Sequence, residues 1–470
     1  MIRSSRTVFL SLVVGSITLS SAFAAEKPDS NWPTWRGPLG NGVAPKAKPP
    51  TEWSATKNIR WKAEIPGKGH ATPIIWGDRI YVQTAVEMNA ADDGDGAALE
   101  SAQPGEREGR PRRGGRGGPG DRGGRRRGLG RGEAPSTPYD FRVIALDRKT
   151  GKTVWSRTVR EEKPHEAGHT DASQASNSPV TDGEHIYAYF GSRGLYCLDM
   201  DGNVKWEKHF GQMTTRNGFG EGSSPALHGN TLVIVWDHEG EDFIAAFDKK
   251  TGDELWRKPR NEPTSWCSPV VVEANGKPQV VVCATNYVKA YDLKTGEEIW
   301  YCTGMTQNTI PTPLVDGDML YAISGFRGAA AYAIKYATAK GNIDDGKAIV
   351  WKYDQDTPYV PTGVVYRNHL YFVENNRPIL TCLNAKTGKP MYDKQRLSGL
   401  DSIYASFVAA NGHVYIAGRN GTTLVLKDGK SFEQVSKNEL DDVFDASPAV
   451  VGDAIYLRGK SHLYCIAEGK

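Results

Sequence analysis

The sequence has 470 residues, a formal net charge of +3, and 39% hydrophobic and 24% charged residues. This composition supports a sizeable buried core, and the charge is too small to imply an anionic partner for the whole molecule. Six cysteines in this length exclude a disulfide-dense scaffold. Beyond the N-terminus no apolar run reaches the roughly 18 residues of a membrane span, so no transmembrane span is expected.

The first 24 residues have the pattern of a signal peptide. Arg3 and Arg6 precede a mostly apolar stretch over residues 8–19, and Ala22–Ala24 has the small-x-small form of a cleavage site. We therefore expect a mature chain that begins at Ala25 and lies in the periplasm or outside the cell. Since no cysteine follows the apolar stretch, a lipoprotein anchor is not expected.

Residues 88–137 differ from the sequence around them. Ten arginines lie between residues 107 and 131, and the segment has no aromatic residue and almost no large aliphatic one. Such a segment cannot bury enough apolar surface to offset the entropy lost on ordering, so we predict a disordered Arg/Gly-rich insert. Nucleic-acid binding is disfavoured because stacking aromatics are missing. A solvated loop that contacts anionic glycan or lipid is the preferred interpretation.

A unit of about 46 residues recurs along the rest of the chain. Regular copies have a small residue before proline, an apolar run, glycine, a second apolar run, a small-apolar-Asp triplet, Thr-Gly and a tryptophan. One copy runs from Ser268-Pro269 through Ala290-Tyr291-Asp292 to Trp300. The position of Ala290 occurs eight times, at Ala145, Cys197, Ala246, Ala290, Ala333, Cys382, Val425 and Cys465.

Each unit has the size and content of one propeller blade. We therefore predict an all-β, eight-bladed β-propeller of four-stranded antiparallel blades over residues 58–470, preceded by an extension over residues 25–57. With strands lettered A to D from the channel outward, the last unit ends without strand D. Residues 58–61, Asn-Ile-Arg-Trp, are an unattached copy of that strand and would close the ring. The Thr-Gly pair is then the C–D turn, and the tryptophan packs between blades.

The phrase from Ala145 to Trp155, with the opening Trp32-Pro33 and the run from Trp35 to Pro38, resembles a known family. It is similar to exported bacterial β-propellers with pyrroloquinoline-quinone (PQQ)-like repeats. The resemblance covers about residues 31–470 apart from the insert. This superfamily includes quinoprotein dehydrogenases and the non-catalytic outer-membrane-protein assembly factor BamB. The resemblance implies the fold, but one fold hosts many activities.

Quinoprotein dehydrogenases of this superfamily hold PQQ beneath adjacent cysteines and beside a calcium ion. This sequence has no Cys-Cys pair, and Cys197, Cys382 and Cys465 take the alanine position of three blades. There they are expected to be free thiols that act as small core residues. No cofactor is therefore expected, and PQQ with calcium is the alternative.

Cys267, Cys283 and Cys302 fall in one blade. A two-residue turn at Asn275-Gly276 would place Cys267 and Cys283 on opposite faces of the sheet. A three-residue turn would bring them together, so both free thiols and a disulfide remain open.

Charged residues collect in loops that this topology places on one face. Because neighbouring strands are antiparallel, the D–A and B–C loops surround the same channel mouth. The candidate ligand-binding residues in these loops are Arg193, Arg216, Glu221, Asp237, His238, Glu239, Arg327, Arg377 and Arg419. Converging guanidinium groups would bind carboxylate, phosphate or sulfate, and the acidic residues favour a mixed-charge partner such as a peptide. Solvated turn charges are an alternative of equal weight.

No catalytic residue and no metal site is predicted. His165, His169 and Asp171 form H-x3-H-x-D in a loop, without a third strong ligand at fixed spacing, which is more typical of a solvated loop. We therefore predict a monomeric, non-catalytic binding or assembly platform of the cell envelope. Its expected partner is an envelope protein or peptide, or an anionic glycan. The alternatives are a PQQ-dependent oxidoreductase and an adhesion module whose active part is the insert.

Overall fold

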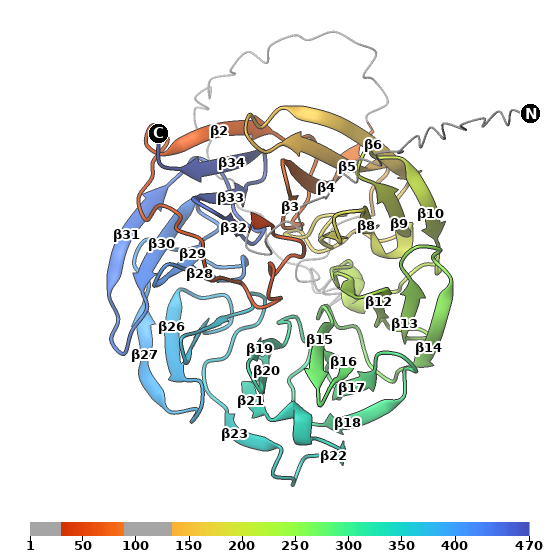
Figure 1. Cartoon of the computed structure of the whole chain (residues 1–470), viewed down its shortest axis with the longest axis vertical. Helices are drawn as coiled ribbons and strands as arrows, with labels where there is room; N and C mark the ends of the chain where they lie inside the picture. The colour runs from red at the N-terminus through yellow and green to blue at the C-terminus, as the bar shows by residue number, and fades with distance from the viewer. Residues whose placement is uncertain (1–29, 89–133, 470) are drawn as a thin grey trace, which may run out of the picture.

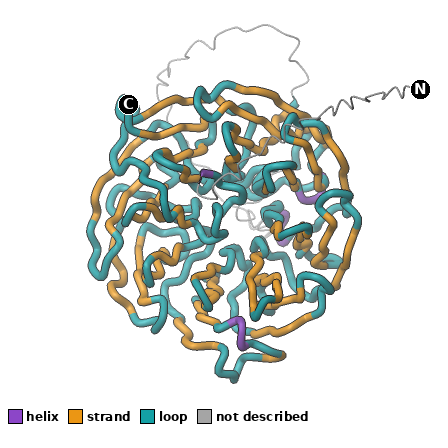
Figure 2. Tube along the Cα trace, viewed as in Figure 1, coloured by secondary structure: helices purple, strands orange, loops and turns teal. Residues whose placement is uncertain are grey.

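The computed structural model describes residues 30–88 and 134–469. Within them the chain forms eight small antiparallel sheets arranged as a ring around a central channel (Figures 1 and 2). The predicted eight-bladed β-propeller is confirmed. The predicted signal peptide and nearly all of the insert lie outside the described residues.

Consecutive strands run from the channel to the rim in each blade. Blades 1 and 2 consist of β3 (Ile74–Trp76), β4 (Arg79–Glu87), β5 (Tyr139–Asp147) and β6 (Thr153–Glu162), then β7 (Val180–Thr181), β8 (His185–Tyr189), β9 (Leu195–Asp199) and β10 (Val204–Lys208). Blades 3 and 4 consist of β11 (Ala226–His228), β12 (Thr231–Trp236), β13 (Phe243–Asp248) and β14 (Glu254–Pro259), then β15 (Val270–Ala274), β16 (Lys277–Cys283), β17 (Val288–Asp292) and β18 (Glu298–Cys302).

The second half of the ring repeats the arrangement. Blades 5 and 6 consist of β19 (Leu314–Asp316), β20 (Met319–Ser324), β21 (Ala330–Ile334) and β23 (Ile349–Tyr353), then β24 (Val364–Tyr366), β25 (His369–Val373), β26 (Ile379–Asn384) and β27 (Pro390–Arg396). Blades 7 and 8 consist of β28 (Val408–Ala410), β29 (His413–Ala417), β30 (Thr422–Lys427) and β31 (Gln434–Glu439), then β32 (Ala449–Val451), β33 (Ala454–Arg458), β34 (His462–Ala467) and β2 (Ile59–Glu64).

Two blades carry a short fifth strand, which the repeat did not predict. β1 (Val43–Ala44) pairs in parallel with β28 on the channel side of blade 7, and β22 (Gly341–Asn342) pairs in parallel with β18 on the rim of blade 4. Short 3₁₀ turns are η2 (Gly191–Arg193), η3 (Arg216–Gly218) and η4 (Tyr336–Thr338). In the described part of the chain, no helix is long and apolar enough to cross a membrane.

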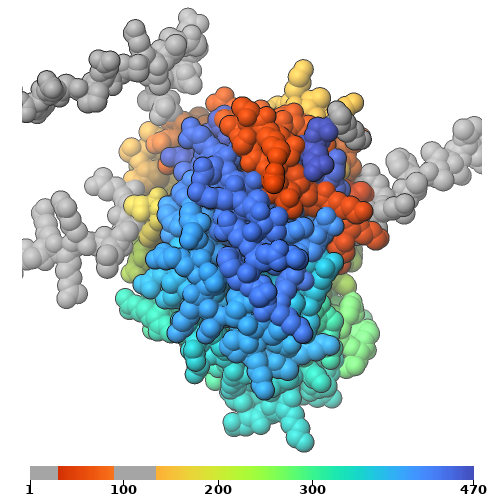
Figure 3. All heavy atoms as spheres, turned by 90° about the vertical axis from the view of Figure 1, so that its left-hand side faces the viewer, coloured from red at the N-terminus to blue at the C-terminus, as the bar shows by residue number. Residues whose placement is uncertain are grey.

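The N-terminal strand closes the ring, as predicted. β2 pairs antiparallel with β34, and Trp61 lies opposite Cys465. Figure 3 shows the red N-terminal segment packed against the blue C-terminal residues. The final blade is therefore assembled from both ends of the described chain.

Tryptophans of the D strands pack on the C–D turn of the next blade. The Trp61 indole N–H donates to the Arg148 carbonyl at 3.0 Å, and a Cβ on Gly151 would lie 2.6 Å from the indole ring. Gly151 also has φ +73°, which favours glycine. Equivalent pairs are Trp155 with Gly202, Trp206 with Gly252, Trp256 with Gly296, and Trp351 with Gly388. The Trp and Thr-Gly positions of the repeat therefore form one contact between blades.

The two ends of the insert leave a continuous β4–β5 hairpin. Glu87 pairs with Tyr139, and the Met88 N–H donates to the Pro138 carbonyl at 2.9 Å. The insert therefore joins strands B and C of blade 1 at a point where a short turn could replace it.

Replacement of residues 89–136 by Gly-Asn is expected to leave the propeller folded, because the β4–β5 ladder remains complete. Thermal unfolding followed by circular dichroism should give one cooperative transition within a few degrees of the parent. Loss of that transition would contradict the prediction. Limited trypsin digestion of the parent should cut first within the arginine-rich stretch, since polar loop tips are preferred cleavage sites.

Candidate functional site

The N-terminal extension lies across one end of the central channel (Figure 1). Trp32 and Ile75 exchange backbone hydrogen bonds of 2.8 and 2.9 Å, and the Pro33 carbonyl accepts one from Thr181 at 3.0 Å. Ile75 and Thr181 lie where their A strands approach the A–B turns. The extension therefore covers the face formed by the A–B and C–D turns.

Arg36 anchors this extension. Its guanidinium donates to the carbonyls of Phe407 and Gly363 at 2.8 Å and of Asn41 at 3.0 Å. Burial lowers the pKa of Arg36 to about 9, and the three carbonyls offset part of the cost of burying the charge. The neighbouring Trp35 lines the channel. The extension thus lies across one end of the channel and contributes an indole to its wall.

A ring of hydroxyl groups surrounds the channel. Each blade supplies one serine or threonine just before strand A, and these are Thr72, Ser178, Ser224, Ser268, Thr312, Thr362, Ser406 and Ser447. At seven successive junctions the backbone N–H of one member donates to the hydroxyl oxygen of the next, at 2.9–3.2 Å. The small residue that opens each repeat unit was the sequence signal for this ring, but no function was assigned to it there.

The channel encloses a central cavity of about 250 Å³. Aromatic and hydroxyl groups dominate its wall, and the aromatic residues are Trp35, Phe219, Trp266, Tyr359 and Tyr404. Asp171, Glu221 and Asp445 add carboxylates, whereas no lysine or arginine is among the described residues that line it. All eight D–A loops contribute to the wall, so the open mouth lies on the D–A/B–C face.

A polar network crosses this mouth between loops distant in the sequence. The Arg419 guanidinium donates to Asp445 at 2.7 Å and to Asp171 at 3.1 Å. The Tyr404 hydroxyl donates to the second oxygen of Asp171 at 3.1 Å, and His70 Nε2 lies 3.5 Å from Asp445. Arg419 also lies over the Tyr404 ring, 4.3 Å from its centroid.

Burial and the charges of this network shift the pKa values of Asp171, Tyr404 and His70. Burial raises the pKa of Asp171, but hydrogen bonding and charge from Arg419 outweigh it, so the net pKa is lowered. Burial, followed by the charge of Asp171, raises the pKa of Tyr404 to about 12. Burial also lowers the pKa of His70 despite the nearby Asp445. The mouth therefore favours an ionised Asp171, a protonated Tyr404 hydroxyl and a neutral His70.

Arg193 and Glu221, two predicted site residues, form a buried ion pair. Arg193 Nη1 lies 3.0 Å from Glu221, and both side chains are less than a tenth exposed. The Glu221 carboxylate also accepts hydrogen bonds of 2.6 Å from the Ser192 amide and hydroxyl. Glu221 lines the central cavity, whereas Arg193 lies behind it and serves to position it.

Asp237, His238 and Glu239 are occupied by neighbouring loops. Asp237 forms a fully buried, two-bond ion pair with Arg260 at 2.6 and 3.1 Å. His238 accepts hydrogen bonds from the Thr214 and Gly240 amides, and Glu239 accepts two from Thr264. These three predicted residues hold loops around the mouth, and none of them lines the central cavity.

Arg327 and Arg377 are the most accessible of the predicted arginines. Arg327 and Arg377 are exposed on B–C loops, and Arg377 pairs with Glu374 at 3.0 Å. Arg216 is half-buried, and its charge acts on the cavity residue Tyr359. The topology puts all three on the D–A/B–C side, but only Arg216 is brought close to the cavity wall.

The H-x3-H-x-D motif is divided between different contacts. His165 Nε2 bonds to the Met213 carbonyl at 2.7 Å, His169 packs edge-on against Phe219, and Asp171 joins Arg419. Asp171 and His169 are therefore cavity residues that were interpreted from sequence as parts of a solvated loop.

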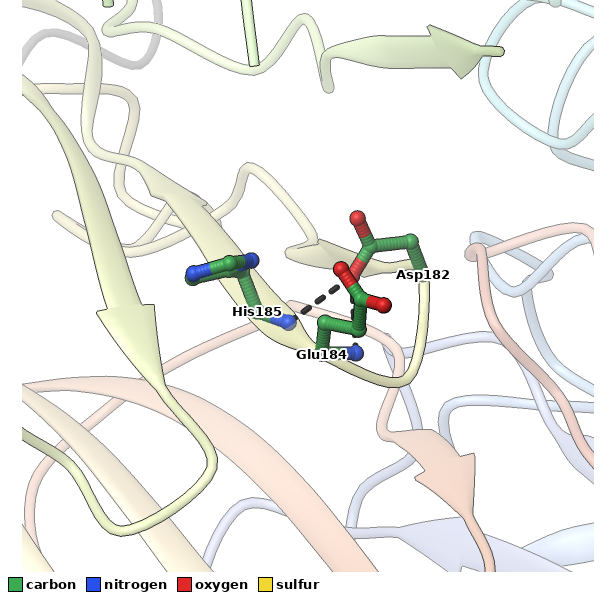
Figure 4. Close-up of side chains that lie close together, drawn as sticks. All are labelled: Asp182, Glu184 and His185. Carbon is green, nitrogen blue, oxygen red and sulfur yellow. Dashed lines mark hydrogen bonds between the residues drawn. The ribbon is translucent and has the colours of Figure 1, made fainter. Parts of the chain in front are cut away.

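The described residues contain one cluster with metal-ligand groups in reach of one another: Asp182, Glu184 and His185 (Figure 4). They come from the β7–β8 turn, on the face opposite the mouth. Asp182 Oδ1 accepts the Glu184 and His185 amides at 2.9 and 2.7 Å, and Oδ2 pairs with Lys249 at 2.8 Å. The cluster is explained by turn formation.

All six cysteines are buried free thiols. β15 and β16 are joined by the two-residue turn at Asn275-Gly276. Cys267 nevertheless contacts Cys283. Cys267 lies before β15 begins, so the alternation of side chains between the two faces of the sheet does not apply to it. Burial, followed by the contact with Cys267, raises the pKa of Cys283 well above its usual value.

These features define an eight-bladed propeller with an N-terminal extension across one end of its channel and an aromatic, hydroxyl-lined cavity toward the other. A family model described as outer membrane protein assembly factor BamB matches residues 139–394, more than half of the chain. The chain belongs to this family. No curated protein matches the sequence.

Solved structures resemble the fold at low sequence identity. A quinohemoprotein alcohol dehydrogenase from Comamonas testosteroni has a TM-score of 0.60 and 10% identity, covering 95% of this chain and 82% of that one. A europium-containing methanol dehydrogenase has a TM-score of 0.59 and 11% identity, covering 93% and 91%. BamB from Moraxella catarrhalis has a TM-score of 0.48 and 12% identity, covering 69% and 93%. At these identities the likeness concerns the fold alone.

Proposed function

We propose that this chain is an exported, non-catalytic, monomeric platform of the cell envelope that binds a protein or peptide partner through its D–A/B–C face. The observation that carries the proposal is the central cavity, which all eight D–A loops line on that face. Membership of the BamB family agrees with a partner-binding role.

The chemistry of the mouth supports a partner of mixed charge. Carboxylates of Asp171, Glu221 and Asp445 lie beside aromatic rings, while Arg216 and Arg327 stand on the same side. Exposed loops on a rigid scaffold are common binding surfaces. A peptide can supply apolar, acidic and basic groups together, whereas a uniform polyanion would be repelled by the carboxylates of the cavity wall.

PQQ-dependent oxidation is the second candidate, because two structures of similar fold are titled alcohol or methanol dehydrogenases. The residues present do not fit that cofactor. PQQ is a planar polycarboxylate whose several carboxylates would have to lie in the central cavity, where the described lining has three carboxylates and no lysine or arginine. The sequence also lacks the adjacent cysteine pair. The binding role is therefore preferred.

Site-specific photocrosslinking tests the proposal with two positions in blade 5. A photoreactive residue at Arg327 lies on the D–A/B–C side, and one at Asp318, which is also exposed, lies on the A–B turn of the opposite face. We expect a discrete crosslinked product with envelope extract from position 327 and none from position 318. The double variant Arg216→Ala with Arg377→Ala should weaken binding of the partner and so lower the crosslink yield. The expected loss of binding free energy is about 1.5–3 kcal/mol for each desolvated charge-assisted contact.

Identical products from both positions, or a product from position 318 alone, would contradict the proposed face. Catalysis is tested separately by dye-linked oxidation of alcohols and sugars after addition of PQQ and calcium. Stoichiometric PQQ binding with turnover would overturn the non-catalytic assignment.

A further inference from the structure

A second cavity of about 230 Å³ adjoins the mouth of the central cavity. The two cavities share four wall residues: His70, Asp171, Ala172 and Asp445. This side cavity lies between the loop that enters blade 1 and the B–C loop of blade 8. A ligand at the mouth could therefore contact both cavities.

The side cavity differs from the central cavity in charge. Its wall holds four cationic side chains, Lys68, Arg419, Arg458 and Lys460, against the two shared aspartates. Both aspartates already accept hydrogen bonds from Arg419. The remaining positive charge comes from groups that the mouth network does not use.

Arg458 is the most unusual of these cations. It is 2% exposed, and no carboxylate of the described chain forms an ion pair with it. One nitrogen, Nη1, donates to the carbonyls of Gln83 at 2.5 Å and Ala71 at 3.3 Å. Burial lowers the pKa of Arg458 to about 9. A buried charge without a counter-ion is costly, and an anion beside it would offset that cost.

The backbone is shaped to admit this guanidinium. A Cβ on Gly69 would collide with Arg458 Nη2 and lie 2.7 Å from the Gln83 carbonyl oxygen. Arg36 offers an instructive contrast, since it is equally buried but is bonded by three carbonyls and lines neither cavity. Arg458 instead combines an incomplete set of acceptors with a position on a cavity wall.

We propose that the side cavity binds an oxyanion group, either carboxylate, phosphate or sulfate, of a ligand whose body lies in the central cavity. Arg458 offers a planar donor, and Lys68 and Lys460 stand at the exposed edge. The aromatic wall, including Trp266 and Tyr404, would pack against an apolar or aromatic body. The inference rests on the proposed function in one respect: both place a ligand at the same mouth of the channel.

Calorimetric titration of the full chain at low ionic strength, with inorganic phosphate and phenyl phosphate, tests this site. We expect both probes to bind, and phenyl phosphate to bind roughly tenfold more tightly because its ring packs on the aromatic wall. Equal affinities would overturn the placement of the ligand body, and no saturable binding of either probe would overturn the site.

Lys68→Gln with Lys460→Gln is the main variant, since both side chains are exposed and the fold should survive. We expect roughly tenfold weaker binding of both probes. The matched control, Lys250→Gln with Lys430→Gln, removes two exposed lysines that line neither cavity and should bind as the parent. Equal losses in both pairs would indicate a general charge effect and overturn the proposal. If the crosslink at position 327 forms but neither phosphate probe binds, the side-cavity inference is overturned and the proposed function is not.

Discussion

Replacing Asp237 with alanine is expected to lower the free energy of unfolding by about 3–5 kcal/mol. Both side chains of this ion pair are fully buried, so the variant leaves the Arg260 guanidinium buried without its carboxylate partner. Burial opposes ionisation of Arg260, but Asp237 outweighs it and holds the pKa of Arg260 above its usual value. Ser265 also loses an acceptor, because its hydroxyl donates to Asp237 at 2.6 Å.

Urea unfolding followed by tryptophan fluorescence at neutral pH measures this effect. Glu254→Ala is the control, because it breaks an exposed ion pair with Arg257 and should cost no more than about 1 kcal/mol. The double variant Asp237→Ala with Arg260→Met should recover part of the loss, since no unpaired charge remains. An unchanged midpoint for Asp237→Ala would show that the ion pair does not hold the loop.

Asp237 also illustrates why the site was harder to predict than the fold. Charges in the B–C loops were expected to face a ligand, but their partners come from loops without fixed repeat spacing, such as Arg260. The same applies to Arg419, whose two aspartate partners lie on loops from other blades. Pairing across loops of unequal length depends on tertiary structure, which the repeat does not specify.

The fold was predictable because each repeat position has one packing role. Position 151 requires glycine because its φ is positive and because the Trp61 indole leaves no room for a Cβ. The same pairing of tryptophan with glycine recurs around the ring. The hydroxyl ring carried an equally regular signal, from Thr72 to Ser447, that could have located the channel wall. Trp35, His70 and Asp171 carried no such signal, since each occurs once in a loop or extension of irregular sequence.

Trp61→Ala is expected to destabilise the protein by about 3 kcal/mol, at the lower end for a large aromatic truncation because the indole is half-buried. The variant removes the hydrogen bond to Arg148, the packing on Gly151 and the contact with Tyr456, whose ring centroid is 6.1 Å away. Chemical unfolding of the variant and the parent provides the measurement.

Trp155→Ala is the matched control for an effect specific to ring closure. Trp155 donates to the Met200 carbonyl at 3.0 Å and packs on Gly202 and Tyr81, so its loss of contacts is closely similar. Its strand, however, is tied to β5 by the Thr-Gly turn, whereas β2 reaches β34 only through non-covalent pairing. Hydrogen exchange should therefore accelerate in β2 and β34 for Trp61→Ala and not for Trp155→Ala. Equal protection of β2 in both variants would mean that the β2–β34 hydrogen bonds hold the ring closed without the indole.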